Sequence, residues 1–159
     1  MYERILIPLD GSKVGETALP VIEELLIKLS PETTVEVTLL RVITRLRHWV
    51  VVGEASAPIA YTEEEMQAMK RQVVAYLNQA GEALRNKGAI VNIKVNTGGN
   101  ACEEILKVAD EIKADMIAMS THGRSGLSRL AFGSITDKVL RGASVPVLAV
   151  RAPEGTANT

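Results

Sequence analysis

Short apolar runs alternate with longer segments of helical periodicity, and this alternation constrains the fold more than any other feature of the sequence. Residues 4–9 form the first run, which is too short for a helix and too uniformly apolar for a half-exposed strand. Further strands are expected at 35–43, 89–95, 114–120 and 145–151, and helices at 13–29, 62–86, 101–112 and 134–141. Strands that alternate with helices favour right-handed crossovers. The sequence therefore predicts an α/β fold with an open five-stranded parallel sheet of order 3-2-1-4-5 and helices on both faces.

Polar residues near the ends of these segments predict where the helices begin. Ser12 is expected to cap the first helix, and Thr62 with Glu65 three residues later matches a capping box. Asn100 and Ser134 are expected to cap the third and fourth helices. Each helix would thus gain an N-terminal partner for its free backbone N–H groups.

The segment 48–61 shows no clear period, although part of it is apolar. We predict a long loop there. Such a loop could act as a lid, contact a second copy of the chain or pack against the body, and its sequence does not choose among these roles.

Composition favours an ordinary single domain. The chain has 159 residues, and we expect residues 1–152 to form the domain and 153–159 to form a disordered tail. Hydrophobic residues make up 47%, charged residues 23%, and the formal net charge is −1, which gives no reason to expect nucleic acid or an anionic membrane as a partner. Cys102 is the single cysteine, so an intrachain disulfide is excluded. Without a signal-peptide pattern or a run of roughly 18 apolar residues, a cytoplasmic protein is expected.

The ends of the first and fourth strands are the expected position of a ligand site. In an open, doubly wound sheet, ligands bind beyond the carboxyl ends of the strands, where the direction of winding reverses. With the order 3-2-1-4-5, that point lies between the first and fourth strands. The topology therefore brings Pro8 and Asp10 opposite Met119 and the glycine-rich segment that follows it.

This glycine-rich segment leads from the fourth strand to the last helix and carries glycines at positions 123, 126 and 133. Glycines allow close approach of the backbone, and Gly133-Ser134 opens a helix whose free N–H groups favour an anion. The hydroxyls of Ser134 and Thr136 could add donors. The segment therefore predicts a phosphate site, and an ordinary helix start is the alternative.

Together these motifs resemble the universal stress protein family over residues 4–151. The resemblance rests on Pro8 and Asp10 after the first strand, on the end of the fourth strand and on the closing apolar strand. ATP-binding members carry Gly, two residues, Gly, nine residues, Gly and then Ser or Thr. The positions that match this signature are Gly123, Gly133 and Ser134. Ser120 departs from it, because it occupies the position of the first glycine.

The resemblance implies a Rossmann-like fold of the adenine-nucleotide alpha hydrolase type, with ATP, ADP or AMP as the ligand. Asp10 would bind the ribose hydroxyls. The adenine pocket would be lined by Pro8, Val42 and Met119, with Ser120 beside the nucleotide. The phosphates would be surrounded, chiefly through backbone N–H groups, by Gly123, Gly133, Ser134, Ile135 and Thr136. A Mg²⁺ or Mn²⁺ ion would be carried by the phosphates, and no residue is assigned as a metal ligand or as catalytic.

Three functions remain open at this point. The first is a nucleotide-binding regulator of the stress response that acts as a homodimer. The second is a non-binding interaction protein of the same fold, because the Ser120 side chain would intrude where the family places bare backbone. The third is a slow ATPase, although the sequence has no P-loop and no obvious base to activate water. His122 could be catalytic or structural, and Cys102 a redox switch or an inert thiol.

The last strand is expected to lie at an edge of the sheet, where unpaired backbone groups can pair with another chain. Its apolar residues Val147 to Val150 therefore predict a homodimer interface. The family resemblance implies the same arrangement.

Overall fold

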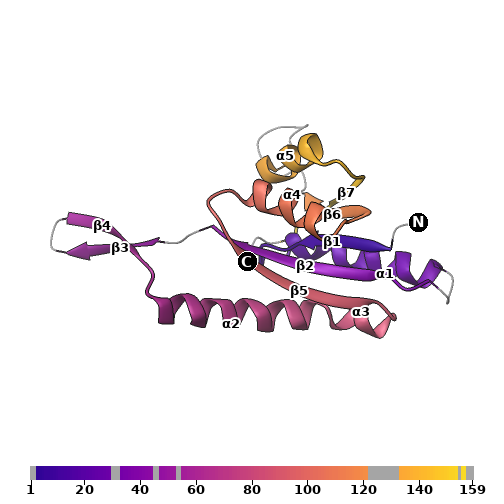
Figure 1. Cartoon of the computed structure of the whole chain (residues 1–159), viewed down its shortest axis with the longest axis horizontal. Coiled ribbons are helices and arrows are strands. Elements are labelled where there is room, and N and C mark those ends of the chain that lie inside the picture. The colour runs from indigo at the N-terminus through magenta and orange to yellow at the C-terminus, as the bar shows by residue number, and fades with distance from the viewer. Residues whose placement is uncertain are drawn as a thin grey trace.

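A five-stranded parallel sheet forms the centre of the molecule in the computed structural model (Figure 1). The structure describes residues 3–29, 33–44, 47–52, 55–121, 133–153 and 155–156. In spatial order, the sheet consists of β5 (Ile90–Thr97), β2 (Glu36–Ile43), β1 (Arg4–Pro8), β6 (Met116–Thr121) and β7 (Val147–Arg151). Numbered among themselves along the chain, these strands have the order 3-2-1-4-5. The predicted fold class is confirmed.

β1 lies between β2 and β6, and its three middle residues are completely buried. Ile7 pairs with Leu39 of β2, and Leu6 pairs with Ile117 of β6. The side chains of Ile5, Leu6 and Ile7 have no exposed surface. A strand that is apolar on both faces has to be covered on both sides, as the uniformly apolar first run predicts.

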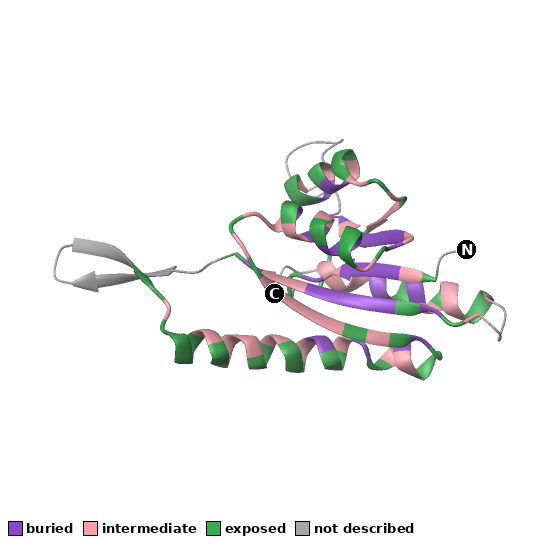
Figure 2. Ribbon diagram, in the orientation of Figure 1, coloured by how far each residue is buried: buried purple, intermediate pink, exposed green. Residues whose placement is uncertain are grey.

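Two layers of helices provide this cover. One face of the sheet carries α1 (Ala18–Lys28), α2 (Glu63–Ala80) and α3 (Glu82–Asn86), and the other carries α4 (Ala101–Glu111) and α5 (Ser134–Gly142). Leu39 packs into the first layer and its neighbour Leu40 into the second, because successive side chains of a strand point to opposite faces. Figure 2 shows the resulting band of buried residues along the central strands.

The capping box before α2 is confirmed. The Thr62 hydroxyl accepts from the Glu65 N–H at 3.2 Å, and the Glu65 carboxylate accepts from the Thr62 N–H at 2.7 Å. The expected helix 62–86 is interrupted at Gly81, where α2 gives way to α3. A Cβ on Gly81 would lie 2.8 Å from Val91 Cγ1, so the glycine lets the helix approach the sheet closely.

Two helices begin differently from the prediction. The 3₁₀ turn η1 (Gly15–Thr17) precedes α1, and the N-cap of α1 is Thr17, so the prediction that Ser12 caps this helix was wrong. The Ser12 hydroxyl instead accepts from the Gly15 N–H at 3.0 Å. Gly133 is the N-cap of α5, and Ser134 is its first helical residue. The prediction that Ser134 caps this helix was therefore wrong. Asn100 does cap α4, through bonds from the N–H groups of Cys102 and Glu103.

The segment predicted as a long loop is a β-hairpin. β3 (Arg47–Val52) pairs antiparallel with β4 (Ala55–Ala60), and Val52 lies opposite Ala55 (Figure 1). Four of the six residues of β3 are Trp or Val, which have high strand propensity. The loop prediction was wrong because these strands pair with each other and not with the central sheet.

Among the helices in the described ranges, none combines the length and the apolar character that a membrane crossing requires.

Truncation of a buried side chain on either face of β2 should destabilise the fold. Leu39→Ala and Leu40→Ala should each lower the free energy of unfolding by about 2–5 kcal/mol, because both side chains are fully buried. Val74→Ala, on an exposed position of α2, should change it by less than about 0.5 kcal/mol. Urea denaturation followed by circular dichroism measures all three. A near-neutral result at one leucine would contradict the burial of that face.

Candidate functional site

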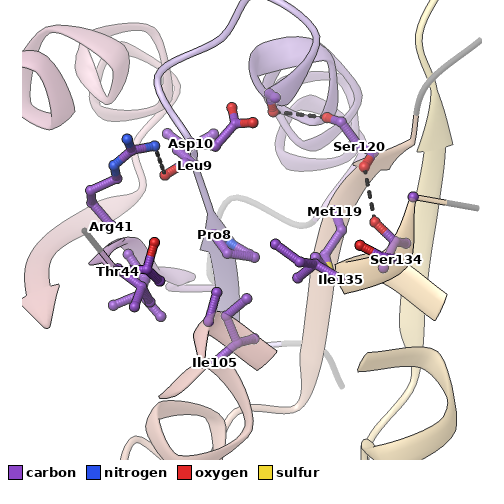
Figure 3. A pocket seen from close by; sticks show the side chains of 16 residues that line it. Pro8, Leu9, Asp10, Arg41, Thr44, Ile105, Met119, Ser120, Ser134 and Ile135 are labelled. Atoms are coloured by element: carbon purple, nitrogen blue, oxygen red, sulfur yellow. Dashed lines mark hydrogen bonds between the residues drawn. The ribbon is translucent and has the colours of Figure 1, made fainter. Parts of the chain in front are cut away.

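A pocket of about 340 Å³ opens at the carboxyl ends of β1, β2 and β6 (Figure 3). Nine of the ten residues proposed for the site line it: Pro8, Asp10, Val42, Met119, Ser120, Gly133, Ser134, Ile135 and Thr136. The tenth, Gly123, lies outside the described residues, as does His122. The sequence analysis missed Leu9, Gly15, Leu40, Arg41, Thr44, Ala101 and Ile105. The volume falls in the range typical of small-molecule sites.

The middle of the pocket is apolar. Leu40, Ile105 and Met119 extend the core beneath α4 into its wall, and Pro8 and Val42 complete this part of the lining. In Figure 3, Pro8, Met119 and Ile105 lie between Asp10 and Arg41 on one side and Ser134 and Ile135 on the other. Such a wall offers apolar contact to a flat ring.

Asp10 lies on the turn that leaves β1, and its position is fixed by Ser12. The N–H and the hydroxyl of Ser12 donate to Asp10 Oδ1 at 2.9 and 2.6 Å. Partial desolvation raises the pKa of Asp10, but the bonds from Ser12 and the charge of Arg41 outweigh it, so that the pKa lies below its ordinary value. At neutral pH, Asp10 is therefore an ionised acceptor held in one orientation.

Gly15 packs directly against this carboxylate. A Cβ at position 15 would lie 2.4 Å from Asp10 Oδ1, well inside contact distance. A side chain at position 15 would therefore displace the Asp10 carboxylate, which occupies the space where its Cβ would lie. No sequence pattern signals this contact, since it depends on how the 3₁₀ turn η1 folds back over Asp10.

Arg41 is the most informative residue that sequence reasoning missed. Its guanidinium donates to the Leu9 carbonyl at 3.4 Å and forms part of the pocket lining beside Asp10 (Figure 3). An arginine between apolar residues near the carboxyl end of β2 was the available signal, because a charge is rarely placed there without a partner. Arg41 gives this end of the pocket a cation as well as an anion.

The opposite end of the pocket is formed by the start of α5. Gly133 makes no side-chain cap, and the first intrahelical bond runs from the Asp137 N–H to the Gly133 carbonyl at 2.9 Å. The N–H groups of Ser134, Ile135 and Thr136 come before it and have no partner within the helix. With the dipole of α5, they favour a negatively charged ligand group.

Ser120 lies at the end of β6, and the backbone that precedes α1 engages its hydroxyl. The hydroxyl donates to the Gly15 carbonyl at 2.8 Å (Figure 3). It also accepts from the Ala18 N–H at 3.0 Å. The Thr136 hydroxyl donates to the Ser120 carbonyl at 3.4 Å. The side chain that departs from the family signature therefore has two backbone partners in the fold.

The described residues support neither a metal site nor a reactive thiol. Among the described residues, no group of three His, Cys, Asp or Glu side chains could hold a metal ion. Cys102 is buried in the core beneath α4, and this burial raises the pKa of its thiol. The thiol is therefore protonated at neutral pH, which disfavours a redox role.

Gly15→Ala should displace the Asp10 carboxylate from its position beside Ser12. The added Cβ would force Oδ1 away from its bonds with Ser12, so the pKa of Asp10, measured by NMR titration, should rise towards its ordinary value. Overpacking should also cost about 1–3 kcal/mol of stability. Gly99→Ala is the matched control, because its Cβ would enter open space. An unchanged pKa in Gly15→Ala would contradict the steric contact.

The chain is similar to known proteins over most of its length. A model of the universal stress protein family matches residues 1–151. The universal stress protein MJ0531 of Methanocaldococcus jannaschii is 27% identical, with 97% of this chain and 85% of that protein covered. The universal stress protein MJ0577 of the same organism is 29% identical, with 95% and 96% covered.

Solved structures match the fold as well. The structure of MJ0577 has a TM-score of 0.69, covers 98% of this chain and 99% of its own, and is 26% identical over the structural match. Three structures with less than 25% identity share the fold and are complexes. One universal stress protein is bound to cAMP (18% identity, TM-score 0.63, 96% and 98% covered). A protein from Archaeoglobus fulgidus is bound to dAMP (20%, 0.60, 94% and 98%), and one from Arabidopsis thaliana is bound to AMP (16%, 0.62, 98% and 99%). With the family match over residues 1–151, these results show that the chain belongs to the universal stress protein family.

Proposed function

We propose that this protein binds an adenine nucleotide in the pocket between β1 and β6, and that it acts in the cytoplasm as a homodimeric regulator of the stress response. One observation carries the proposal. A single pocket combines an apolar wall, an ionised carboxylate and a free helix N-terminus. A nucleotide needs these three environments for its base, its sugar and its phosphates. Complexes of other family folds with AMP, dAMP and cAMP support the same ligand class.

Each part of the nucleotide has a chemical match in the pocket. The adenine ring packs between Pro8, Val42 and Met119, where apolar surface is lost from water. The ribose hydroxyls donate to the Asp10 carboxylate, which is ionised at neutral pH. The phosphates accept from the N–H groups at the start of α5, together with the Ser134 hydroxyl and the backbone of Gly123. A Mg²⁺ or Mn²⁺ ion, when present, is carried by the phosphates.

The two alternative functions have less support. A non-binding interaction protein would be favoured if the Ser120 side chain intruded into the space of the nucleotide. The Ser120 hydroxyl instead forms hydrogen bonds with the backbone of Gly15 and Ala18. An ATPase needs a base to activate water, and our proposal assigns no catalytic residue. Binding that signals the nucleotide state is the function that the pocket supports best.

Isothermal titration with ATP and AMP, with and without Mg²⁺, tests the proposal. The folded protein should bind with micromolar affinity. Asp10→Ala should weaken binding by about 10- to 100-fold, because it removes charge-assisted hydrogen bonds to the ribose. Asp110→Asn, an exposed position on α4, should leave the affinity unchanged. Absence of heat from a folded wild-type sample would contradict nucleotide binding. Equal losses in both variants would contradict the role of Asp10.

The homodimer is proposed to form through the outer edge of β7. Among the described strands, β7 pairs only with β6, and its apolar residues Val147 to Val150 are each half-buried. On the inner side, the Pro146 carbonyl accepts a hydrogen bond from β6, and the Ala152 N–H donates one to β6. Because every second residue of a parallel strand faces the same neighbour, the backbone groups of Ala149 face outwards. Another copy can pair with this free edge.

Ala149→Pro should convert the dimer into a monomer. The substitution removes an outward N–H without removing a bond to β6. The molar mass from light scattering at micromolar concentration should fall by about half. Thr97→Pro is the matched control, because it removes an outward N–H from β5, at the opposite edge of the sheet, and should leave the dimer intact. A wild-type monomer, or dissociation in the control alone, would contradict an interface at β7.

A further inference from the structure

The hydroxyl of Ser120 joins two parts of the chain that are far apart in sequence. It donates to the Gly15 carbonyl at 2.8 Å and accepts from the Ala18 N–H at 3.0 Å, across separations of 105 and 102 residues. A glycine at this position could make neither bond. The serine therefore ties the end of β6 to the turn between β1 and α1.

This turn is the one that holds Asp10. The Gly15 N–H donates to the Ser12 hydroxyl at 3.0 Å, and that hydroxyl donates to Asp10 Oδ1 at 2.6 Å. The backbone of Gly15 also packs against the same carboxylate oxygen. A continuous series of hydrogen bonds therefore runs from Ser120 through Gly15 and Ser12 to Asp10. Any movement of Gly15 has to move the carboxylate or break a bond of this series.

The bonds of Ser120 also explain how a side chain fits at a position where the family signature has glycine. Both partners belong to the η1–α1 backbone, so the donor and an acceptor of the hydroxyl are used within the fold. Compared with glycine, Ser120 therefore adds a methylene group and a hydroxyl to the rim of the pocket. The hydroxyl already has partners in the fold and is not a free polar group that points at a ligand. A role in positioning is therefore favoured over a role in ligand contact.

We propose that Ser120 is a positioning residue, whose hydroxyl clamps the turn of residues 10–18 to β6 and so holds the Asp10 carboxylate in place for the ribose of the nucleotide. The ribose part rests on the proposed function, whereas the clamp itself stands on the hydrogen bonds alone. The clamp predicts selectivity for adenine nucleotides with free ribose hydroxyls, because a carboxylate in a fixed position favours a ligand that presents donors to it.

A measurement without ligand tests the clamp. In Ser120→Ala and Ser120→Gly, the Ala18 amide should exchange its hydrogen about tenfold faster or more, and NMR titration should show the pKa of Asp10 rising towards its ordinary value. Ser120→Thr keeps a hydroxyl and should restore both values. Thr38→Val is the control, because Thr38 is a hydroxyl residue of the sheet that takes no part in the bonds to this turn. Unchanged protection of Ala18, or an equal loss in Thr38→Val, would overturn the clamp.

A binding measurement tests what the clamp does. Ser120→Ala should weaken AMP binding by roughly three- to tenfold and should weaken the binding of a 2′,3′-dideoxy analogue by much less, since that ligand gives Asp10 nothing to accept. In the Asp10→Ala background, the Ser120→Ala change should have little further effect on AMP. Equal losses for both nucleotides, or full additivity with Asp10→Ala, would overturn the positioning role.

The two proposals fail in different ways. If the folded wild-type protein binds no adenine nucleotide, the proposed function fails, and amide exchange at Ala18 still decides whether Ser120 clamps the turn. If the wild type binds AMP but Ser120→Ala keeps its preference for AMP over the dideoxy analogue, the positioning role fails and the proposed function stands.

Discussion

The burial of β1 between β2 and β6 is the constraint on which the rest of this structure depends. Ile5, Leu6 and Ile7 expose no surface, so both faces of the strand need a layer of helices. The chain first adds β2 and β5 on one side of β1 and then β6 and β7 on the other side. Helices α1 and α4 therefore cover opposite faces of the sheet. The carboxyl ends of β1 and β6 are then not bridged by a connection, and the pocket opens there. The position of the site is thus a consequence of how the core is covered.

Sequence patterns predicted the parts of the structure that follow from local periodicity. Most of the central strands contain apolar runs, so the α/β sheet could be expected. The nine pocket residues were expected from the residues at the ends of β1 and β6 together with the family resemblance. The role of Gly15 could not be expected, because it depends on the path of a 3₁₀ turn. Arg41 carried a signal in its position near the carboxyl end of β2, but the sequence alone did not show that its side chain lies at the pocket. The hairpin of β3 and β4 was missed for a related reason, since it contributes no strand to the central sheet.

The charges of the pocket are separated in a way that suits a polar ligand with two different ends. Asp10 is an anion whose pKa is lowered by Ser12 and Arg41, and it would repel a phosphate placed beside it. The N-terminus of α5 carries the opposite partial charge across an apolar wall. In the proposed complex, the sugar therefore lies at Asp10 and the phosphates lie at the N-terminus of α5.

Ser120 illustrates how a fold can accommodate a side chain where the signature of ATP-binding family members has glycine. A partly buried hydroxyl is costly only when it lacks partners, and this one has a backbone acceptor and a backbone donor within 3.0 Å. The same bonds draw Gly15 towards β6, and Gly15 is the residue whose missing side chain makes room for Asp10. The serine and the glycine therefore act on one carboxylate from two sides. Replacement of either would change the geometry of Asp10 without touching the ligand, so the residue type at position 120 is best understood through the turn that it holds.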